Sequence, residues 1–516
     1  MINLSDTYGA VAAAEEAVDI SAFAIEDVDV WVHCREILLQ PFVNLRLNAY
    51  RSLVGPDHQP DPFRWQAKRS WPVRPASLQP SHRRARMLVA TPHDMEPVNP
   101  DVLIWSVFTD YQDVSRCGVF ARLTDGLRAL VDDEWTVASF VRAIPSSLAA
   151  PFHHPHHLVF MLDPDARSRP IPGEESLMDA CRDLSRWAGR EGYEYALDVP
   201  AFSRRLRELW WRIEHLTDLI GAIRPHLVVI SSYSNWERSA VVAAANRLGV
   251  ETIDIEHGFW GPFSPYGALR YLPATGSLSV PKVFWTWGSW QQNALQRVLG
   301  PHQDTHRTIV GGNPWRVAAP LLKGDGREEA RVHAPLRASR RGQVVVLLAW
   351  QPDMLVHEPG GRLLPRALTD LDSSIRCNLM LCLRLHPRQR HLTALFERAL
   401  SAAGFENWDV TESTHASLGE LLRCADLLLT SYSTVAFEAN EQGVPVGIVD
   451  KFGTRMCSEL IENGYFHDVA TPERLGEALR SRVQLSAERI DYCAPDPELP
   501  ASTLRALLNG CREGTV

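Results

Sequence analysis

A short apolar run that gives way abruptly to hydroxyl side chains is the feature that most constrains how this chain folds. Residues 427–429 are three leucines, too few for a helix, and they predict a buried parallel strand. The sequence Thr-Ser-Tyr-Ser-Thr follows, and residues 435–442 then have a helical pattern that Gly443 ends. Residues 444–449 predict the next strand. A cluster of hydroxyl groups is therefore expected where a strand ends and a helix begins.

This junction has the chemistry of a nucleotide site. Ligands of open α/β sheets bind at the carboxyl ends of the strands, and a helix N-terminus offers unpaired N–H groups and partial positive charge to a phosphate. Glu438 lies one helical turn after Thr434 on the same face, where a carboxylate can accept hydrogen bonds from two ribose hydroxyls. The alternative is that Ser433 or Thr434 is an ordinary N-cap of the helix.

A second strand–helix–strand succession precedes this junction in the chain. Residues 227–230 and 252–255 predict buried strands, and residues 238–248 predict an alanine-rich helix between them. Short loops in such a succession are typical of a parallel sheet. The second strand runs directly into Glu256-His257-Gly258, which is poor packing material but suits a site at the carboxyl edge of a sheet.

The C-terminal motifs resemble those of a known enzyme group. The sequence TSYSTVAFEA, followed by GVPVGIVD, is similar to the donor half of GT-B glycosyltransferases that build bacterial capsule and lipopolysaccharide, and of related transferases that use CDP-glycerol, sialic acid or Kdo donors. Those families pair this element with an upstream His-Pro, which this chain has at His386-Pro387. The resemblance covers about residues 225–470. It implies an α/β fold with two Rossmann-like domains facing a cleft.

The His-Pro element adds to the predicted nucleotide site. Pro387 suits the first position of a helix, which leaves His386 above the sheet edge, where an imidazole can donate to a phosphate oxygen or to the leaving group. Arg384 and Arg388 flank it and can add positive charge. A structural capping histidine is the alternative for His386. The nucleotide-binding residues predicted in this way are Arg384, His386, Pro387, Arg388, Ser431, Ser433, Thr434 and Glu438.

The predicted catalytic base lies in the other half of the chain. A His-Gly at a strand end resembles the acceptor-side element of these transferases; CDP-glycerol transferases use a similar His as the proposed base, and GT-B sialyltransferases an acidic residue near a Gly. This chain carries both, as Glu256 and His257, so the identity of the base stays open. An unperturbed pKa near 6.5 favours His257, with Glu256 orienting it or staying buried. A structural histidine at a turn is the alternative.

Three further features suggest sites but favour simpler interpretations. Four histidines lie in residues 153–157, yet Pro155 breaks the helical spacing that a metal site would use, so a polar loop is favoured. Residues 163–165 and 370–372 match the short DxD pattern of metal-dependent GT-A enzymes, which arises often by chance. Residues 284–290 include three tryptophans that suit a sugar platform, although core packing is favoured. We therefore expect no metal.

Composition limits the class of protein. A chain of 516 residues, 45% hydrophobic and 22% charged, suffices for two or three domains. The net charge of −9 argues against nucleic acid as a partner. Nine cysteines without a CxxC pair favour reduced thiols, and no apolar run is long enough to span a membrane. We expect a cytoplasmic protein, with peripheral association at the inner membrane left open.

The domain limits follow from these patterns. Residues 1–80 form an extension with a proline-rich linker, 81–318 the acceptor-side domain, 319–490 the nucleotide-sugar domain and 491–516 a tail. Residues 123–144 are predicted to form a helix with Trp135 and Phe140 facing inward.

The predicted function is glycosyl transfer from a nucleotide-activated donor to a glycan or glycolipid acceptor of a growing bacterial surface polysaccharide. The resemblance favours a cytidine nucleotide, CMP-Kdo or CMP-sialic acid, without excluding UDP-sugars. No cofactor is expected besides the nucleotide-sugar co-substrate. No Walker A or GxGxxG loop is present, which argues against ATPases and dehydrogenases. The alternatives are an isomerase resembling UDP-GlcNAc 2-epimerases, which share a Ser-rich turn followed by Glu, and a non-catalytic polysaccharide assembly protein.

Overall fold

The computed structural model describes most of the chain, with gaps. The described residues are 13–31, 87–90, 99–107, 110, 113–115, 118–131, 135–142, 156–161, 168–191, 199–234, 236–258, 269, 272–273, 275–323, 343–352, 354–357, 362–481 and 489–513. The proline-rich segment, His153, His154, Asp163 and Asp165 lie outside them. None of the helices in this part of the chain is long and apolar enough to cross a bilayer.

The first domain is built on an eight-stranded sheet in the order β12-β11-β10-β9-β4-β7-β8-β3. Its strands are β3 (Met87–Ala90), β4 (Val102–Val107), β7 (Val137–Arg142), β8 (His157–Met161), β9 (Leu227–Ser231), β10 (Glu251–Ile255), β11 (Val283–Thr286) and β12 (Arg307–Val310). All neighbours are parallel except β3 and β8. The strand order reverses between β4 and β9, which makes this the switch point of the sheet.

Helices cover both faces of this sheet, as a parallel sheet requires. They are α4 (Thr124–Arg128), α5 (Glu174–Arg190), α6 (Val199–Ile223), α7 (Trp236–Arg247), α8 (Ser289–Leu299) and α9 (Pro314–Lys323). Val228 and Ile230 of β9 pack in one buried cluster with α6 and α7, while Val229 belongs to the cluster on the opposite face. A small hairpin, β5 (Asp113–Ser115) with β6 (Gly118–Phe120), lies outside the sheet.

The second domain is a six-stranded parallel sheet in the order β15-β14-β13-β16-β17-β18. Its strands are β13 (Val344–Ala349), β14 (Leu379–Arg384), β15 (Trp408–Asp409), β16 (Leu427–Thr430), β17 (Val446–Ile448) and β18 (His467–Asp468). The helices between them are α12 (Met354–His357), α13 (Arg366–Thr369), α14 (Ser373–Arg376), η7 (Pro387–Leu392), α15 (Thr393–Ala402), α16 (Thr411–His415), α17 (Leu418–Cys424), α18 (Val435–Glu441), α19 (Lys451–Met456), α20 (Ser458–Glu462) and α21 (Pro472–Ser481). The switch point lies between β13 and β16.

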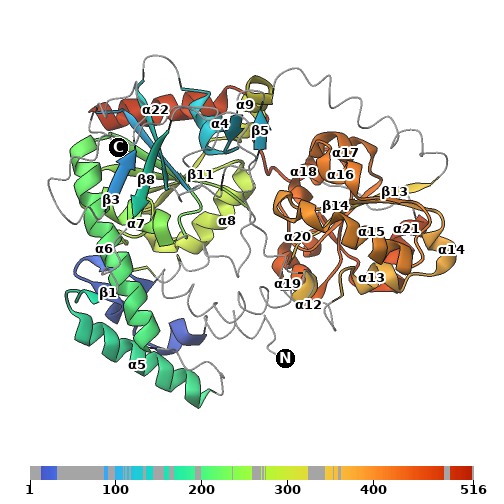
Figure 1. Cartoon of the computed structure of the whole chain (residues 1–516), viewed down its shortest axis with the longest axis horizontal. Coiled ribbons are helices and arrows are strands. Elements are labelled where there is room, and N and C mark those ends of the chain that lie inside the picture. The colour runs from blue at the N-terminus through green and yellow to red at the C-terminus, as the bar shows by residue number, and fades with distance from the viewer. Residues whose placement is uncertain are drawn as a thin grey trace.

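The predicted fold class, an α/β chain with two Rossmann-like domains of the GT-B type, is confirmed. Figure 1 shows the two domains side by side, with the C-terminal domain in orange. The strands and the helix predicted between residues 227 and 255 are present as β9, α7 and β10. The strand, helix and strand predicted between residues 427 and 449 are present as β16, α18 and β17, and Gly443 ends the helix at φ +77°.

The helix predicted for residues 123–144 is wrong. Among the described residues of this stretch the chain forms the short α4 and then strand β7. Phe140 packs between Trp105 (ring centroids 6.2 Å apart) and His157 (4.5 Å). Because β7 lies between β4 and β8 and is covered on both faces, its apolar residues do not alternate, and such a run also fits a helical pattern.

The C-terminal segment completes the first domain. Helix α22 (Leu499–Glu513) lies across the N-terminal domain in Figure 1, far from the orange C-terminal helices. Arg512 pairs with Asp101 at 2.9 Å, and its guanidinium lies 3.8 Å from the ring centroid of Trp135. Helix α9 also continues across the predicted boundary at residues 318–319, and Ala318 packs on Phe120. The first domain is therefore made from two separate stretches of the chain.

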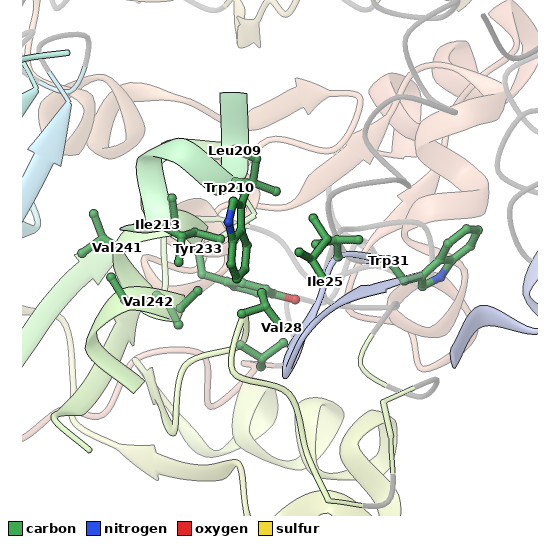
Figure 2. Packing of buried hydrophobic residues seen from close by; sticks show 14 of the residues in the cluster. Ile25, Val28, Trp31, Leu209, Trp210, Ile213, Tyr233, Val241 and Val242 are labelled. Carbon is green, nitrogen blue, oxygen red and sulfur yellow. The ribbon is translucent and has the colours of Figure 1, made fainter. Parts of the chain in front are cut away.

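An N-terminal hairpin anchors in the same domain. Its strands are β1 (Ala24–Ile25) and β2 (Val28–Asp29). Figure 2 shows Ile25 and Val28 packed towards Trp210 of α6, in a cluster that continues to α7. Trp31 is 2% exposed, and its Nε1 donates to Glu15 at 3.0 Å. Part of the predicted N-terminal extension is thus integral to the core.

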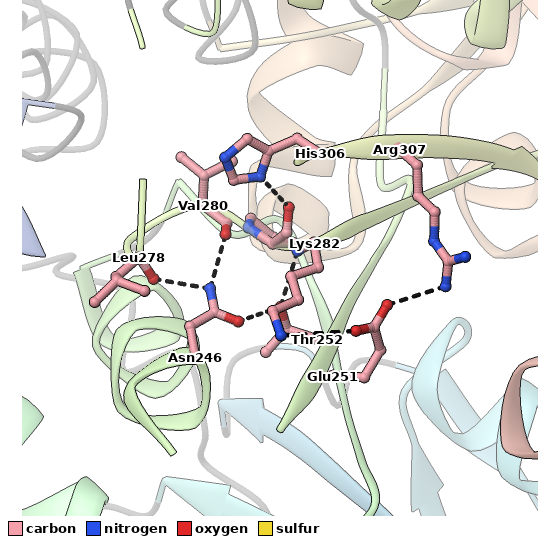
Figure 3. A network of polar contacts seen from close by, with 9 residues as sticks. Asn246, Glu251, Thr252, Leu278, Val280, Lys282, His306 and Arg307 are labelled. Atoms are coloured by element: carbon pink, nitrogen blue, oxygen red, sulfur yellow. Dashed lines mark hydrogen bonds and ion pairs between the residues drawn. The ribbon is translucent and has the colours of Figure 1, made fainter. Parts of the chain in front are cut away.

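The amino edge of the first sheet is closed by a polar network (Figure 3). The Asn246 amide donates to the carbonyls of Leu278 and Val280, and Thr252 donates to Asn246. Nε2 of His306 accepts from the Ser277 N–H at 3.0 Å, so its Nδ1 carries the proton given to the Pro281 carbonyl. These bonds fix the loop before β11 at the amino edge of the sheet.

Candidate functional site

The first part of the hydroxyl cluster is scaffold. Ser431 is fully buried after β16, next to Asp450, which caps α19 by accepting from the Gly453 N–H at 2.7 Å. Burial raises the pKa of Asp450, and the Gly453 N–H and the Ser431 hydroxyl oppose that rise. A Cβ on Gly453 would lie 2.4 Å from the Ser431 carbonyl oxygen, so the two backbones are in close contact. Ser431 therefore supports the junction between β16 and α18 from the protein interior.

Ser433 and Thr434 are the half-buried members of the cluster at the start of α18. The Thr434 side chain makes no capping hydrogen bond, and the Val435 N–H reaches Ser433 Oγ only at 3.4 Å. The ordinary N-cap interpretation thus fails for Thr434 and is weak for Ser433. Because α18 has only seven residues, the hydroxyls matter more here than the helix dipole.

Gln351 was missed by the sequence reasoning. It follows β13, and its Oε1 accepts from the Tyr432 N–H at 3.0 Å and from Thr430 Oγ1 at 3.3 Å. The side chain thereby ties together the exits of the two strands at the switch point. Its only sequence signal was its place two residues after the apolar run of residues 344–349.

His386 is exposed after β14, as predicted, and Pro387 begins the 3₁₀ helix η7. The Gln389 N–H donates to the His386 carbonyl at 2.7 Å, which closes the first turn. The side chains of Pro387 and Arg388 lie outside the described part of the chain.

Arg384 has a structural role in addition to the one predicted. Its Nη1 donates to the carbonyls of Ser413 at 2.8 Å and Ala416 at 2.6 Å. These bonds hold the segment around α16 against β14. The nucleotide contact of Arg384 stays a prediction.

Glu438 lies where charges from both domains meet. Burial raises its pKa and Glu441 adds to that rise, while the guanidinium groups of Arg122, Arg384 and Arg316 oppose it. Arg122 and Arg316 belong to the first domain, and Arg316 pairs directly with Glu441. The carboxyl predicted to hold a ribose is thus half-buried at the boundary between the domains.

The two halves of the predicted site meet. His257 is exposed at the exit of β10, and a Cβ on the next residue, Gly258, would lie 3.7 Å from Cγ2 of Thr434. The carboxyl exit of a central strand in one sheet therefore lies close to the junction after β16 in the other. This proximity brings the predicted base to the predicted phosphate site.

Glu256 is enclosed rather than open to a ligand. It is 0% exposed; its Oε2 accepts from the Trp287 N–H and its Oε1 from the Tyr492 hydroxyl, both at 3.0 Å. Burial raises its pKa to about 8, so the carboxyl is protonated at neutral pH. A fully buried carboxyl whose two oxygens are both hydrogen-bonded inside the protein is poorly placed to reach an acceptor hydroxyl.

The tryptophans of residues 284–290 pack inside the protein. Trp285 is 0% exposed, and its Nε1 donates to the Gly312 carbonyl at 2.8 Å. A Cβ on Gly311 would lie 2.0 Å from the Trp285 ring, which explains the glycine there. Trp287 is 7% exposed, and Trp290 packs on Phe437 of the second domain. The core-packing interpretation is confirmed for Trp285 and Trp287.

The candidate metal motifs have structural roles where they are described. His156 faces Asp125 at 3.5 Å, and both side chains are buried. Asp372 caps α14, and Asp370 pairs with Arg366 at 3.1 Å. No group of three or more metal-type side chains occurs within the ranges given above.

Comparisons with known proteins give structural likenesses only. The chain matches no family model and no curated protein by sequence. Among solved structures it is similar to S. aureus MnaA with UDP (11% identity, 80% of this chain and 97% of that chain, TM-score 0.46). It is also similar to UDP-GlcNAc 2-epimerase from Neisseria meningitidis bound to UDP-GlcNAc (12%, 79% and 99%, 0.47). The wall teichoic acid polymerase TagF is a third (12%, 81% and 91%, 0.44). Likenesses of this degree assign no activity.

Proposed function

We propose that this chain is a glycosyltransferase that moves a sugar from a nucleotide-activated donor to a glycan or glycolipid acceptor. The observation that carries the proposal is the close approach of Gly258 to Thr434, where an added Cβ would lie 3.7 Å from Cγ2. A transferase must hold two substrates at once, with the acceptor hydroxyl next to the bond that breaks. A site shared by the carboxyl edges of two Rossmann-like sheets suits that requirement.

The second domain would hold the donor. Ser433 and Thr434 offer hydroxyl donors, and His386 offers an imidazole, to the phosphate that departs with the nucleotide. Such donors stabilise negative charge that develops in the transition state. Glu438 would accept hydrogen bonds from the ribose. We favour a cytidine nucleotide, as in CMP-Kdo or CMP-sialic acid, on the motif resemblance alone.

His257 would act as the base. It is exposed at the shared site, whereas the neighbouring Glu256 is enclosed and protonated. The imidazole takes the acceptor hydroxyl proton while the acceptor oxygen bonds to the anomeric carbon. The bond from that carbon to the phosphate oxygen breaks, and its electron pair leaves with the nucleotide. Arginine, histidine and hydroxyl groups would take the role of a metal.

Calorimetric titration with CMP, CDP, UMP, UDP and ADP tests the donor site. We expect a pyrimidine nucleotide to bind and His386→Ala to weaken it. No binding of CMP, CDP, UMP or UDP at millimolar concentration refutes the proposal. Incubation of the matching nucleotide-sugar without an acceptor separates the isomerase alternative, which would then turn the sugar over unaided.

A further inference from the structure

A short strap joins the two domains beside the site. We use this name for residues 489–494, which lead from the second domain back to the first. The Ile490 N–H donates to Asn440 Oδ1 of α18 at 2.9 Å. Four residues later the Ala494 N–H donates to the Trp287 carbonyl at 2.8 Å. The strap is therefore bonded to both domains within a few residues.

The strap is held closely against the first domain. A Cβ on Gly288 would lie 2.5 Å from the Tyr492 carbonyl oxygen and 2.6 Å from that of Asp491. The Trp290 N–H donates to the same Asp491 oxygen at 3.1 Å. Because the two backbones are in direct contact here, the strap cannot shift without breaking these contacts and the hydrogen bond to Asp491.

Tyr492 connects the two predicted halves of the site. Its ring stacks on Phe437 of α18, with centroids 3.7 Å apart and planes 9° apart. The Tyr492 and Trp287 rings pack edge to face, with their centroids 5.7 Å apart. Its hydroxyl donates to Glu256, the residue directly before His257. One buried side chain thus touches the helix that carries Glu438 and the strand exit that carries His257.

The surroundings of this contact favour a neutral pair. Burial raises the pKa of Glu256 to about 8, and the nearby Asp254 adds to that rise. Burial likewise raises the pKa of Tyr492, and Glu438 contributes to it. Gln291 is the polar neighbour of both groups. A protonated carboxyl still accepts hydrogen bonds, so the contact persists at neutral pH without a buried charge.

We propose that Tyr492 is a positioning residue that sets the separation between His257 and the phosphate-binding junction through Glu256 and Phe437. The roles of His257 and the junction rest on the proposed function. A base misplaced by about 1 Å can cost about 10²-fold in rate. The nucleotide itself contacts the second domain, so its affinity should not depend on the strap.

Tyr492→Phe is the sharpest test, because it keeps the stacked ring and removes only the hydroxyl. We expect kcat to fall about 10–100-fold, with the nucleotide Kd within about twofold of wild type. Tyr233→Phe is the matched control, since it also removes one hydroxyl from a wholly buried tyrosine, in the core cluster of Figure 2. That control should leave kcat within about twofold.

Glu256→Gln gives a second readout that a merely structural role would not move. The amide oxygen can still accept from the Trp287 N–H, while its NH2 group can donate to the Tyr492 oxygen, and the amide does not ionise. Wild-type turnover should fall above about pH 8, because the buried Glu256 then loses its proton and its charge disturbs the contact with Tyr492. The Glu256→Gln variant should lack this alkaline fall whatever its turnover at pH 7, and the same fall in both proteins would contradict the role of Glu256.

An activity-free measurement separates this proposal from the proposed function. Bound nucleotide should raise the His257 pKa followed by NMR, because its phosphate lies near the imidazole. In Tyr492→Phe that rise should shrink by half or more. No rise in the wild type contradicts the proposed function, whereas an undiminished rise in Tyr492→Phe overturns the positioning role. Unchanged kcat with a lowered Tm, or loss of nucleotide binding, also overturns it.

Discussion

Gly453→Ala should damage the candidate nucleotide site without touching any group that binds the nucleotide. Gly453 lies in α19, against the backbone of the junction after β16. A Cβ there would lie 2.4 Å from the Ser431 carbonyl oxygen, 2.8 Å from the Ser431 carbonyl carbon and 2.7 Å from Cγ2 of Ile448. Ile448 is 0% exposed, so neither neighbour has free space.

The size of the effect follows from these distances. Normal contact requires about 1 Å more separation, and overpacking of this kind costs about 1–3 kcal/mol. The helix propensity of alanine returns up to about 1 kcal/mol. We therefore expect a net loss of about 1–2 kcal/mol. Loss of one charge-assisted hydrogen bond to phosphate, about 1.5–3 kcal/mol, would raise the nucleotide Kd about 10–100-fold.

The assay pairs this variant with Gly419→Ala in α17 of the same domain. At residue 419 the nearest atom to a new Cβ is Gln442 Nε2, 3.9 Å away, so that change should stabilise by up to about 1 kcal/mol. Calorimetric titration gives the nucleotide Kd, and thermal unfolding gives the Tm. A Gly453→Ala protein that binds nucleotide and melts like wild type would refute the argument.

Other predictions test the catalytic and metal assignments. His257→Ala should lower kcat by about 10²–10⁴ with nucleotide affinity unchanged, whereas His386→Ala should weaken both; steady-state kinetics and calorimetry measure this, and the reverse pattern would exchange the domains' roles. Turnover should survive EDTA, and a loss that Mn²⁺ or Zn²⁺ restores would contradict metal independence. Burial lowers the pKa of His157 to about 4 from 6.5, so stability present above pH 6.5 should be lost as the pH falls towards 4. The largest loss of unfolding free energy from this group is about 3 kcal/mol. His157→Phe, which keeps a ring on Phe140, should make Tm nearly independent of pH between 7 and 4. An equal slope of Tm against pH in both proteins would exclude His157 as the cause of that slope.

The elements that the sequence predicted best are strands and helices with a local signal. Residues 427–429 form the buried strand that their apolar run predicted. Gly443 has the positive φ that its place after a helix predicted. Strand β7 was missed because burial on both faces removes the alternation that marks a strand. That information lies in the neighbouring strands rather than in residues 137–142.

Some site residues likewise have a local sequence signal, whereas the contacts of others depend on distant parts of the chain. His386 and Thr434 were predicted as site residues because each lies between an apolar run and a following helix. Arg384 was assigned to the nucleotide, yet two carbonyl groups take its guanidinium, which only tertiary structure reveals. The enclosure of Glu256 depends on Tyr492, 236 residues further along the chain. No local pattern could predict that contact.

The return of α22 to the first domain determines when that domain can be finished during synthesis. The Arg512–Asp101 pair joins residues 411 positions apart, with the whole second domain between them. Helix α9 ends at Lys323 and α22 begins at Leu499. At about 5–20 residues per second, α22 follows α9 from the ribosome by roughly 10–35 s. Throughout that interval the face around Trp135 lacks the cover that α22 later provides, so the first domain cannot complete its packing until the last helix has emerged.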